Sequence, residues 1–381
     1  MADAYSVSGY GRMVADPVRV GAYARALEAT VRPGCTVLDL GTGTGVFAMH
    51  AARLGARRVY AVEPADAIDT AAELARVNGV ADRIEFIKGL SLEVTLPEKV
   101  DVVVADLRGV LPPFRRTIAT LADARARFLA PGGHLIPRRD TLFMAPAFAP
   151  EEWAANAGPE TVLGFDYAAA RRHSFSRWTR GIFRSEQLLS APRAWAAIDY
   201  LACTPPDTDV CGTAECAVTR PGTAHGLAVW FEAELAEGVG FSTGPDHATV
   251  YQTALFPWPE PVELAAGDLV RGTVEARMAG DDYLWSWGAA IERAGRAPLS
   301  FHQTDFPSHL APMRTLRRRA DTFVPRLGGD GEVDAFALGR MDGSASIGDI
   351  ARAVMERFPG RFERWEDAVS RVGELSDRYS A

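Results

Sequence analysis

The residues best suited to chemistry in the first part of the chain are a run of glycines framed by carboxylates. The segment VLDLGTGTG (37–45) is typical of a strand that runs into a glycine turn and opens a helix. Glycines let the backbone approach a ligand closely, and a helix N-terminus offers free N–H groups. Glu63 ends the next apolar run, where a carboxylate can accept hydrogen bonds from both hydroxyls of a ribose. The alternative is that Glu63 caps the helix expected near Ala65, because acidic residues favour helix N-termini.

The glycine spacing distinguishes two kinds of nucleotide site. A dinucleotide fingerprint has a glycine three positions past its second one, but position 46 is Val. The spacing instead resembles motif I of the class I S-adenosylmethionine-dependent methyltransferases. That resemblance implies that the cofactor is bound by Asp39, Gly41, Gly43, Gly45 and Glu63. A dehydrogenase is disfavoured by the glycine spacing alone.

Five apolar runs separated by helical patterns must position these residues over 1–137. The runs are TVLDL (36–40), RVYAVE (58–63), RIEFIK (83–88), VDVVVAD (100–106) and GHLIP (133–137). Strands that alternate with helices predict an α/β, Rossmann-like domain, with a parallel sheet covered by helices on both faces.

The rest of the chain has a different pattern. Residues 138–300 contain short β-like stretches separated by Pro- and Gly-containing turns, which predict an antiparallel sandwich or barrel. Within them, 164–178 looks helical. We expect a connector over 301–319, and then three helices in a small domain over 320–381. Ser346 is placed to cap the second of these helices, and Gly343 stands where the first would stop.

From MVADPVRVGAY (13–23) to FSTGPDHATVYQTALF (241–256), the chain resembles the protein arginine methyltransferases. These enzymes pair a methyltransferase domain with a β-barrel and a helical dimerisation arm, so the resemblance implies a homodimer with its arm near 164–178. It also implies that Arg19 binds the carboxylate of S-adenosylmethionine, a role that suits a planar guanidinium. The alternative for Arg19 is the surface of an N-terminal helix. Ser91 falls near the position that contacts adenine.

The resemblance is incomplete in the loop that would bind the acceptor. The family uses two glutamates on one loop to hold a guanidinium, whereas ADLRGVLPPFRR has Asp106 at the first position and Arg115 at the second. Arg115 would repel a cationic guanidinium. We therefore expect the acceptor to be a less basic amine, or a carboxylate that Arg115 helps to bind, with Asp106 as a general base or an orienting dipole. The alternatives are that Asp106 caps a helix and that Arg115 lies on a solvated helix.

The family's Thr-His-Trp element is also altered. The matching residues are Thr249, Val250 and Tyr251, and His247 could replace the missing histidine only through a local bulge. The alternative is that His247 is structural or exposed.

The C-terminal segment resembles the PqqD-like domain, a small winged-helix module that recognises the leader peptides of ribosomally made peptides. The resemblance rests on Met341, Asp342 and Gly343, which are followed by S-I-G-D-I-A. Such modules bind a peptide as an added strand, and FVPRL (323–327) is the strand expected here. The alternative is a three-helix cap or an oligomerisation element. Residues 326–381 contain eight Arg, no Lys and eleven acidic residues, which disfavours DNA binding.

Composition narrows the function classes. The chain has 381 residues, 48% of them hydrophobic, which is enough for two or three domains. It has no apolar run near the ~18 residues of a membrane helix, and its net charge of −8 disfavours nucleic-acid and anionic-membrane binding. Four cysteines without CxxC spacing and an N-terminus without a secretory signal predict no disulfide framework, no metal site and a cytoplasmic location.

The sequence therefore predicts an S-adenosylmethionine-dependent methyltransferase that releases S-adenosylhomocysteine. The expected acceptor is a peptide or an amino-acid-like natural-product intermediate, methylated on an amine or a carboxylate. One alternative is a true peptide or protein arginine N-methyltransferase that uses Asp106 and a second acid. The other is a peptide-binding scaffold that is not an enzyme and keeps a vestigial cofactor site.

Overall fold

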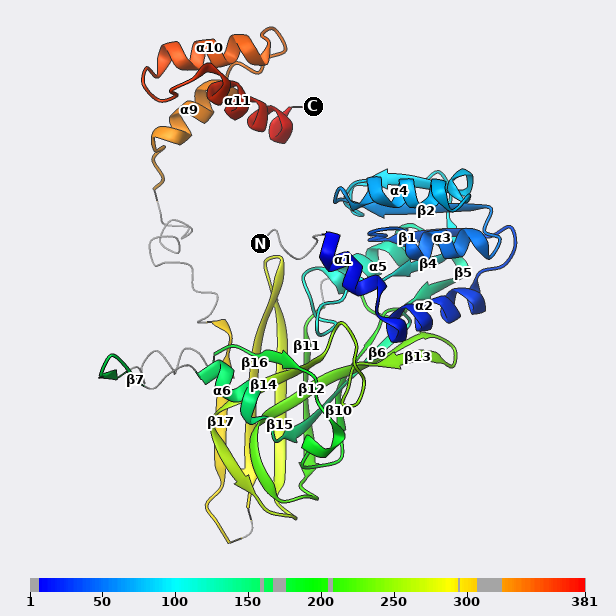
Figure 1. The fold of residues 1–381 in the computed structure, drawn as a ribbon, viewed down its shortest axis with the longest axis vertical. Coiled ribbons are helices and arrows are strands. Elements are labelled where there is room, and N and C mark those ends of the chain that lie inside the picture. The colour runs from blue at the N-terminus through cyan, green and yellow to red at the C-terminus, as the bar shows by residue number, and fades with distance from the viewer. Residues whose placement is uncertain are drawn as a thin grey trace. The chain divides into compact units, whose positions relative to one another are not determined.

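The computed structural model describes residues 7–157, 161–166, 176–204, 208–293, 295–306 and 324–380. The chain divides into two compact units, residues 1–309 and 310–381 (Figure 1). Each unit has a hydrophobic core of its own. None of the described helices is both long and apolar enough to cross a membrane.

A five-stranded parallel sheet forms the first part of the larger unit. In spatial order its strands are β3 (Ile84–Lys88), β2 (Arg58–Glu63), β1 (Thr36–Leu40), β4 (Val100–Ala105) and β5 (Leu129–Ile136). The predicted parallel sheet is confirmed, because the continuous apolar runs form buried strands. Asp39 pairs in register with Val104, so the carboxyl ends of β1 and β4 lie side by side.

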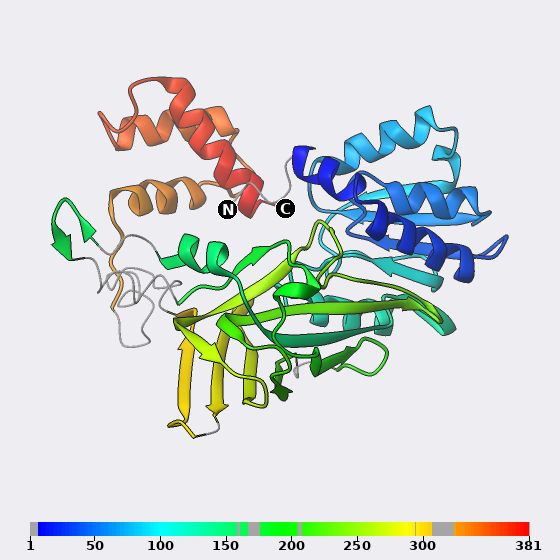
Figure 2. The same ribbon diagram turned by 60° about the horizontal axis from the view of Figure 1, so that its bottom comes forward.

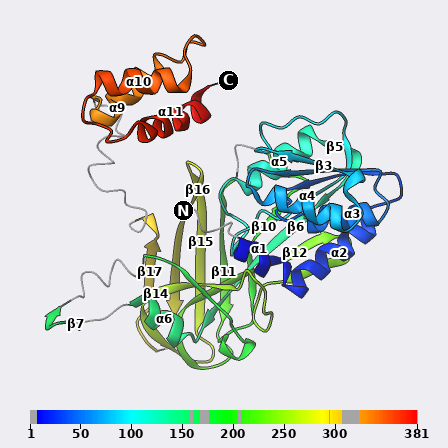
Figure 3. The same cartoon turned by 45° about the horizontal axis from the view of Figure 1, so that its top comes forward.

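Helices surround this sheet and begin where the sequence provides caps. They are α1 (Val7–Val14), α2 (Pro17–Thr30), α3 (Val46–Arg53), α4 (Ala67–Val77) and α5 (Thr117–Arg127). Asp16 caps α2 by accepting from the N–H groups of Val18 and Arg19, and Pro17 starts the helix. Helices α3, α4 and α5 pack against the strands (Figure 3).

The second part of the larger unit consists of two antiparallel sheets, as predicted (Figure 2). One has the order β10 (Arg193–Asp199), β6 (Arg139–Ala147), β12 (Gly222–Ala236), β14 (Thr253–Leu264) and β9 (Thr179–Gly181), with β13 (Val239–Ser242) paired to β12. The other has the order β11 (Val210–Ala217), β15 (Leu269–Ala279), β16 (Asp282–Glu292) and β17 (Leu299–Thr304). Large aromatic side chains such as Trp258 and Trp287 are fully buried in this part.

Two expectations for this region differ from the structure. Helix α6 (Pro150–Ala157) precedes a short hairpin of β7 (Thr161–Val162) and β8 (Phe165–Asp166), so the start of the segment expected to be helical is a hairpin. Residues 167–175 lie outside the described part of the chain. The connector expected from 301 begins later, because residues 301–304 belong to β17, where Phe301 packs against Trp258.

The smaller unit has the three predicted helices, α9 (Gly329–Leu338), α10 (Ile347–Arg357) and α11 (Trp365–Tyr379). Ser346 caps α10 in a reciprocal capping box with Asp349, as predicted. Helix α9 ends at Leu338, so the expectation that it stops at Gly343 is wrong. Residues 324–380 contain no strand, so the edge expected at 323–327 is absent from its described part, and no wing is found there.

Candidate active site

The glycine turn after β1 has a backbone that side chains would disrupt. Gly41, Gly43 and Gly45 adopt left-handed φ values of 73°, 54° and 80°. A Cβ atom on Gly41 would lie 2.5 Å from Cδ2 of Leu107, and one on Gly43 would lie 2.6 Å from the ring of Tyr10. The glycines therefore allow the turn to lie directly against α1 and against the loop after β4.

Two carboxylates hold this turn in different ways. Glu63 is buried, and its two oxygens accept from the N–H groups of Gly43 and Ala65, each at 3.0 Å. Each oxygen keeps further acceptor capacity, so the bond to Ala65, just before α4, is compatible with ribose binding. Asp39 lies beneath the turn and accepts from the Thr42 hydroxyl at 2.6 Å and the Ala48 N–H at 2.9 Å. Burial raises the pKa of Asp39 to about 6. Asp39 shapes the turn and does not line the neighbouring cavity.

A cavity of about 410 Å³ in the larger unit is lined by the ends of β1 and β2, the segment after β3, the loop between β4 and α5, the start of α5, and Asp281 before β16. The glycine turn contributes Gly41, the segment after β3 contributes Leu90–Leu92, and the loop between β4 and α5 contributes Leu107 and residues 114–117. Ser91 and Gly41 thus line the same cavity, and the contact of Ser91 with adenine stays a prediction. Its lining is mainly apolar, as a bound nucleoside base requires.

Arg115 lies exposed at this cavity, with a left-handed φ of 46°. Its N–H donates to Oδ1 of Asp282, on β16, at 2.8 Å. Its guanidinium lies over the ring of its neighbour Phe114. Arg115 is therefore solvated, as the structural alternative expected, but it precedes α5 and is not part of a helix.

Arg19 is buried, so the alternative of a surface arginine is wrong. Its Nε donates to Oδ2 of Asp106 and, at 3.3 Å, to the Tyr251 hydroxyl. Its Nη1 donates to the carbonyl of Met13 at 3.1 Å, and its guanidinium lies 5.2 Å from the centre of the Phe47 ring. This places the guanidinium beside α3 and the glycine turn, although Arg19 comes from α2.

Asp106 is the counterion of Arg19. Its side chain is 3% exposed, and Tyr251 donates to the same oxygen as Arg19. Burial by itself would raise the pKa of Asp106, but Arg19 and Arg108 outweigh it and hold that pKa below its ordinary value. A carboxylate with a lowered pKa is a weak base. The helix-cap alternative is wrong, because α5 begins only at Thr117.

Arg108 is the functional candidate that sequence reasoning missed. Its Nε and Nη2 donate to the two oxygens of Asp140 at 2.7 and 2.9 Å. Its Nη1 donates to the Tyr23 hydroxyl at 2.6 Å and to Oδ1 of Asp106 at 3.2 Å. The hydroxyl of Tyr200 donates to Asp140 at 2.7 Å. The available signal was an arginine inside an otherwise apolar stretch, LRGVLPP.

We call these seven residues the buried charge cluster: Arg19, Tyr23, Asp106, Arg108, Asp140, Tyr200 and Tyr251. Six of the seven are buried residues, and the side chain of the seventh, Asp106, is 3% exposed. They come from α2, the loop after β4, β6, the end of β10 and the segment before β14, so the cluster connects the parallel sheet to the antiparallel sheets.

The segment that replaces Thr-His-Trp reaches the site without a histidine. Tyr251 contacts Asp106, and the N–H of Val250 donates to Oδ2 of Asp16 at 2.7 Å. His247 is exposed, and its Nδ1 lies 3.0 Å from the carbonyl of Pro245. His247 therefore takes no part in the cluster.

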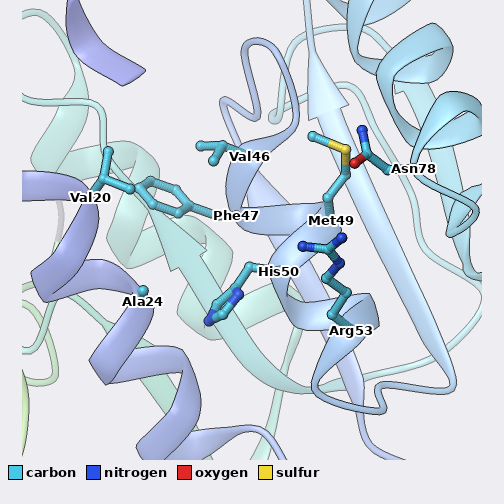
Figure 4. Close-up of a pocket in the computed structure, with 8 residues that line it drawn as sticks. All are labelled: Val20, Ala24, Val46, Phe47, Met49, His50, Arg53 and Asn78. Carbon is cyan, nitrogen blue, oxygen red and sulfur yellow. The ribbon is translucent and has the colours of Figure 1, made fainter. Parts of the chain in front are cut away.

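A second, smaller cavity of about 190 Å³ lies between α2 and α3 (Figure 4). Its lining residues are Val20, Ala24, Val46, Phe47, Met49, His50, Arg53 and Asn78. It contains none of the site residues predicted from the sequence.

Comparisons with known proteins agree with this geometry. The model of the ribosomal protein L11 methyltransferase family matches residues 23–137, and that of the arginine methyltransferase oligomerization subdomain matches residues 151–286. Protein arginine N-methyltransferase 6 of Danio rerio is 30% identical over 291 residues, covering 71% of this chain and 82% of the relative. Protein arginine N-methyltransferase 1 of Schizosaccharomyces pombe is 29% identical over 289 residues, covering 73% and 84%.

Solved structures share the fold. The enzyme–prozyme heterotetrameric complex of Trypanosoma brucei PRMT1 with AdoHcy has a TM-score of 0.73 at 21% identity, and the match covers 79% of this chain and 99% of that one. Arabidopsis thaliana protein arginine methyltransferase 10 has a TM-score of 0.69 at 22% identity, covering 79% and 97%. These names support the arginine N-methyltransferase alternative better than the natural-product interpretation.

S-adenosylmethionine is the cofactor, and the residues present fit it. The glycine turn keeps left-handed φ values and borders the cavity at Gly41, and Glu63 beside it retains acceptor capacity for hydroxyl groups. The glycine motif, the fold and the relatives thus all indicate S-adenosylmethionine as the cofactor. The chain belongs to the protein arginine methyltransferase family and is an S-adenosylmethionine-dependent methyltransferase.

Proposed function

We propose that this methyltransferase modifies a nitrogen atom of a peptide or protein. The observation that carries the proposal is a cavity lined by both the glycine turn and the loop after β4. In this proposal Gly41, Gly43 and Gly45 hold the cofactor through their backbone, Glu63 accepts from its ribose, and Ser91 lies beside its adenine. Bound S-adenosylmethionine supplies an activated methyl group on a cationic sulfur.

Arg19 would bind the carboxylate of the cofactor, and Asp106 would position Arg19. Asp106 and Tyr251 hold the Nε side of the guanidinium, and Met13 accepts from Nη1. A guanidinium has five N–H donors, so further donors remain for a carboxylate. Asp106 acts as a counterion in this proposal and not as the general base that the sequence suggested.

The first candidate acceptor is an arginine side chain, which the names of the relatives support. The second is an aliphatic amine, which a specific observation favours: both oxygens of Asp106 already accept from arginines or Tyr251. A guanidinium keeps its positive charge up to a pKa above 12, whereas an amine loses its proton near a pKa of ~10. A carboxylate held by Arg115 is the third outcome to test.

The test is a transfer assay with S-adenosylmethionine on a set of matched peptides. One peptide carries an arginine, one carries a lysine at the same position, and one carries a glutamate. Fragmentation mass spectrometry then locates the added methyl group. Methylated arginine would establish the first candidate, a methylated amine the second, and a methyl ester the third. Binding of S-adenosylhomocysteine by calorimetry without any transfer would contradict the proposal.

We also propose that the smaller unit recruits the acceptor peptide. The support is its resemblance to PqqD-like modules and its own core, which includes Val333, Ile350 and Val372. Strand addition is not part of this proposal, because residues 324–380 contain no strand. Deletion of 320–381 is expected to raise the KM of a long peptide and to leave that of a short acceptor unchanged. An equal change for both would contradict it.

A homodimer and a cytoplasmic location complete the proposal. The match to an oligomerization subdomain supports self-association, and the Trypanosoma brucei relative assembles as a heterotetramer. Light scattering on the purified chain tests the dimer, and a monomeric mass would contradict it.

A further inference from the structure

Arg108 lies buried in the loop after β4. It lies two residues after Asp106, and its side chain is 1% exposed. Its guanidinium forms a two-bond, fork-like pair with Asp140, which is fully buried on β6. Such bidentate pairs fix direction as well as charge. Arg108 therefore cannot turn toward the cavity without leaving the buried Asp140 with only the hydrogen bond from Tyr200.

Both oxygens of each aspartate in the cluster accept hydrogen bonds from arginine or tyrosine side chains. Asp106 accepts at Oδ1 from Arg108 and at Oδ2 from Arg19 and Tyr251. Asp140 accepts at Oδ1 from Arg108 and at Oδ2 from Arg108 and Tyr200. Two arginines and two aspartates balance to zero net charge. An incoming guanidinium that bound Asp106 would share its carboxylate with Arg19 and Arg108.

We infer that Arg108 is a specificity-determining residue, which neutralises Asp106 and disfavours acceptors that bind as cations. This inference rests on the proposed function, because it concerns the charge of the acceptor nitrogen. Arg108 acts through Asp106 and is thus a positioning residue. The selected acceptor is a nitrogen that reaches the methyl group uncharged, having released its proton to solvent.

The physical argument concerns the bonds that a cation would gain. A guanidinium bound to a free buried carboxylate forms strong charge-assisted bonds. In this site Asp106 already accepts charge-assisted bonds from Arg108 and Arg19, so an added cation would make the net charge of the cluster positive and would share one carboxylate with two arginines. Like charges in a water-poor site are costly.

The test uses two variants with opposite expected effects. Asp140→Asn leaves Arg108 without its main counterion, which adds one positive charge to the cluster. Arg108→Met/Asp140→Asn keeps the cluster neutral and frees Oδ1 of Asp106. The measured quantity is the ratio of kcat/KM for the arginine peptide to that for the matched lysine peptide. We expect the double variant to raise this ratio about tenfold or more and Asp140→Asn to lower it.

Arg125→Met is the matched control, since Arg125 is also partly buried but donates mainly to the backbone carbonyls of Tyr200 and Cys203. It is expected to leave the ratio unchanged. A general loosening of the fold cannot move the two test variants in opposite directions. The inference is overturned if both variants bind S-adenosylhomocysteine as the wild type does and keep the wild-type ratio.

A binding measurement separates the inference from the proposed function. Fluorescence anisotropy measures the affinity of each S-adenosylhomocysteine complex for the labelled arginine and lysine peptides. The preference for the arginine peptide is expected to rise in the double variant and to fall in Asp140→Asn. A wild-type enzyme that transfers no methyl group to either peptide overturns the proposed function, and the order of these affinities then decides the inference.

Discussion

Two buried aspartates at the ends of neighbouring strands behave in opposite ways. Asp39, near the end of β1, accepts only from Thr42 and Ala48, and burial raises its pKa to about 6. Asp106, just after β4, is equally enclosed, but Arg19 and Arg108 lower its pKa. The same side chain thus shapes the backbone on the cofactor side and serves as a counterion on the acceptor side.

The comparison extends to the regions around them. The cofactor side consists of one turn whose glycines and backbone N–H groups come from consecutive residues. The acceptor side consists of side chains from distant parts of the chain, such as Arg108 and Asp140 or Asp106 and Tyr251. In our proposal the glycine turn holds the cofactor through local backbone geometry, whereas acceptor choice depends on long-range charge pairing.

The largest expected effect comes from breaking the buried pair on the acceptor side. Asp140→Ala leaves Arg108 buried without its main counterion, which is expected to lower the free energy of unfolding by about 3–5 kcal/mol. The control is Glu215→Ala in the same part of the chain, where the pair with Arg271 is about half exposed. That change is expected to cost less than about 1 kcal/mol. Denaturant unfolding measures both, and equal losses would remove the distinction between the two pairs.

The next effect is the pH dependence of the unfolding free energy, which tests the roles of Asp39 and Asp106. The pKa of Asp39 is raised in the folded state, so its contribution to stability is fully present below about 3.8 and is lost as pH rises through about 6. Relative to Asp39→Asn, the wild type is expected to lose about 3 kcal/mol of unfolding free energy between pH 4 and pH 7.

Relative to Asp106→Asn, the unfolding free energy of the wild type is expected to change with pH in the opposite direction. The pKa of Asp106 is lowered, so its contribution is present above the ordinary value and is lost as pH falls through the lower folded value. Urea unfolding at several pH values measures both variants. Parallel curves for wild type and Asp39→Asn would show that burial does not govern Asp39.

A smaller effect separates backbone strain in general from a specific disturbance of the glycine turn. Gly41→Ala places a side chain at a φ of 73° and against Leu107. It is expected to weaken S-adenosylhomocysteine binding roughly tenfold, a change of about 1.4 kcal/mol, because the added Cβ would lie 2.5 Å from Cδ2 of Leu107 and the turn must shift. Gly79→Ala is the control, with a φ of 68° and no atom within 4 Å of the added Cβ. Calorimetry should find wild-type affinity for the control, and a similar loss in both variants would contradict a local role for Gly41.

The smallest effect concerns the exposed arginine at the cavity. Arg115→Ala is expected to lower the KM of a cationic peptide by about threefold at low salt, with the difference shrinking as salt rises. The cofactor affinity should stay the same. Arg53→Ala, at the separate cavity of Figure 4, serves as the control. An effect of Arg115→Ala that persists at high salt would indicate a structural role.

Much of the fold could be read from the sequence, because the signals are local. The runs at 36–40 and 58–63 coincide with β1 and β2, since continuous apolar residues suit strands buried on both faces. Ser346 caps α10 because its partner Asp349 is three residues away. The late start of the connector was missed, because Phe301 gains its burial from Trp258, which is distant in the chain.

The sequence by itself determined the glycine turn, Glu63 and hence the cofactor, because each depends on the conformations that a few consecutive residues allow. Only the tertiary structure decided the state of the acceptor side. Arg108 and Asp140 are 32 residues apart, and Asp106 and Tyr251 are 145 apart. No local pattern encodes which charges meet after folding, and those encounters set the protonation, direction and availability of Asp106.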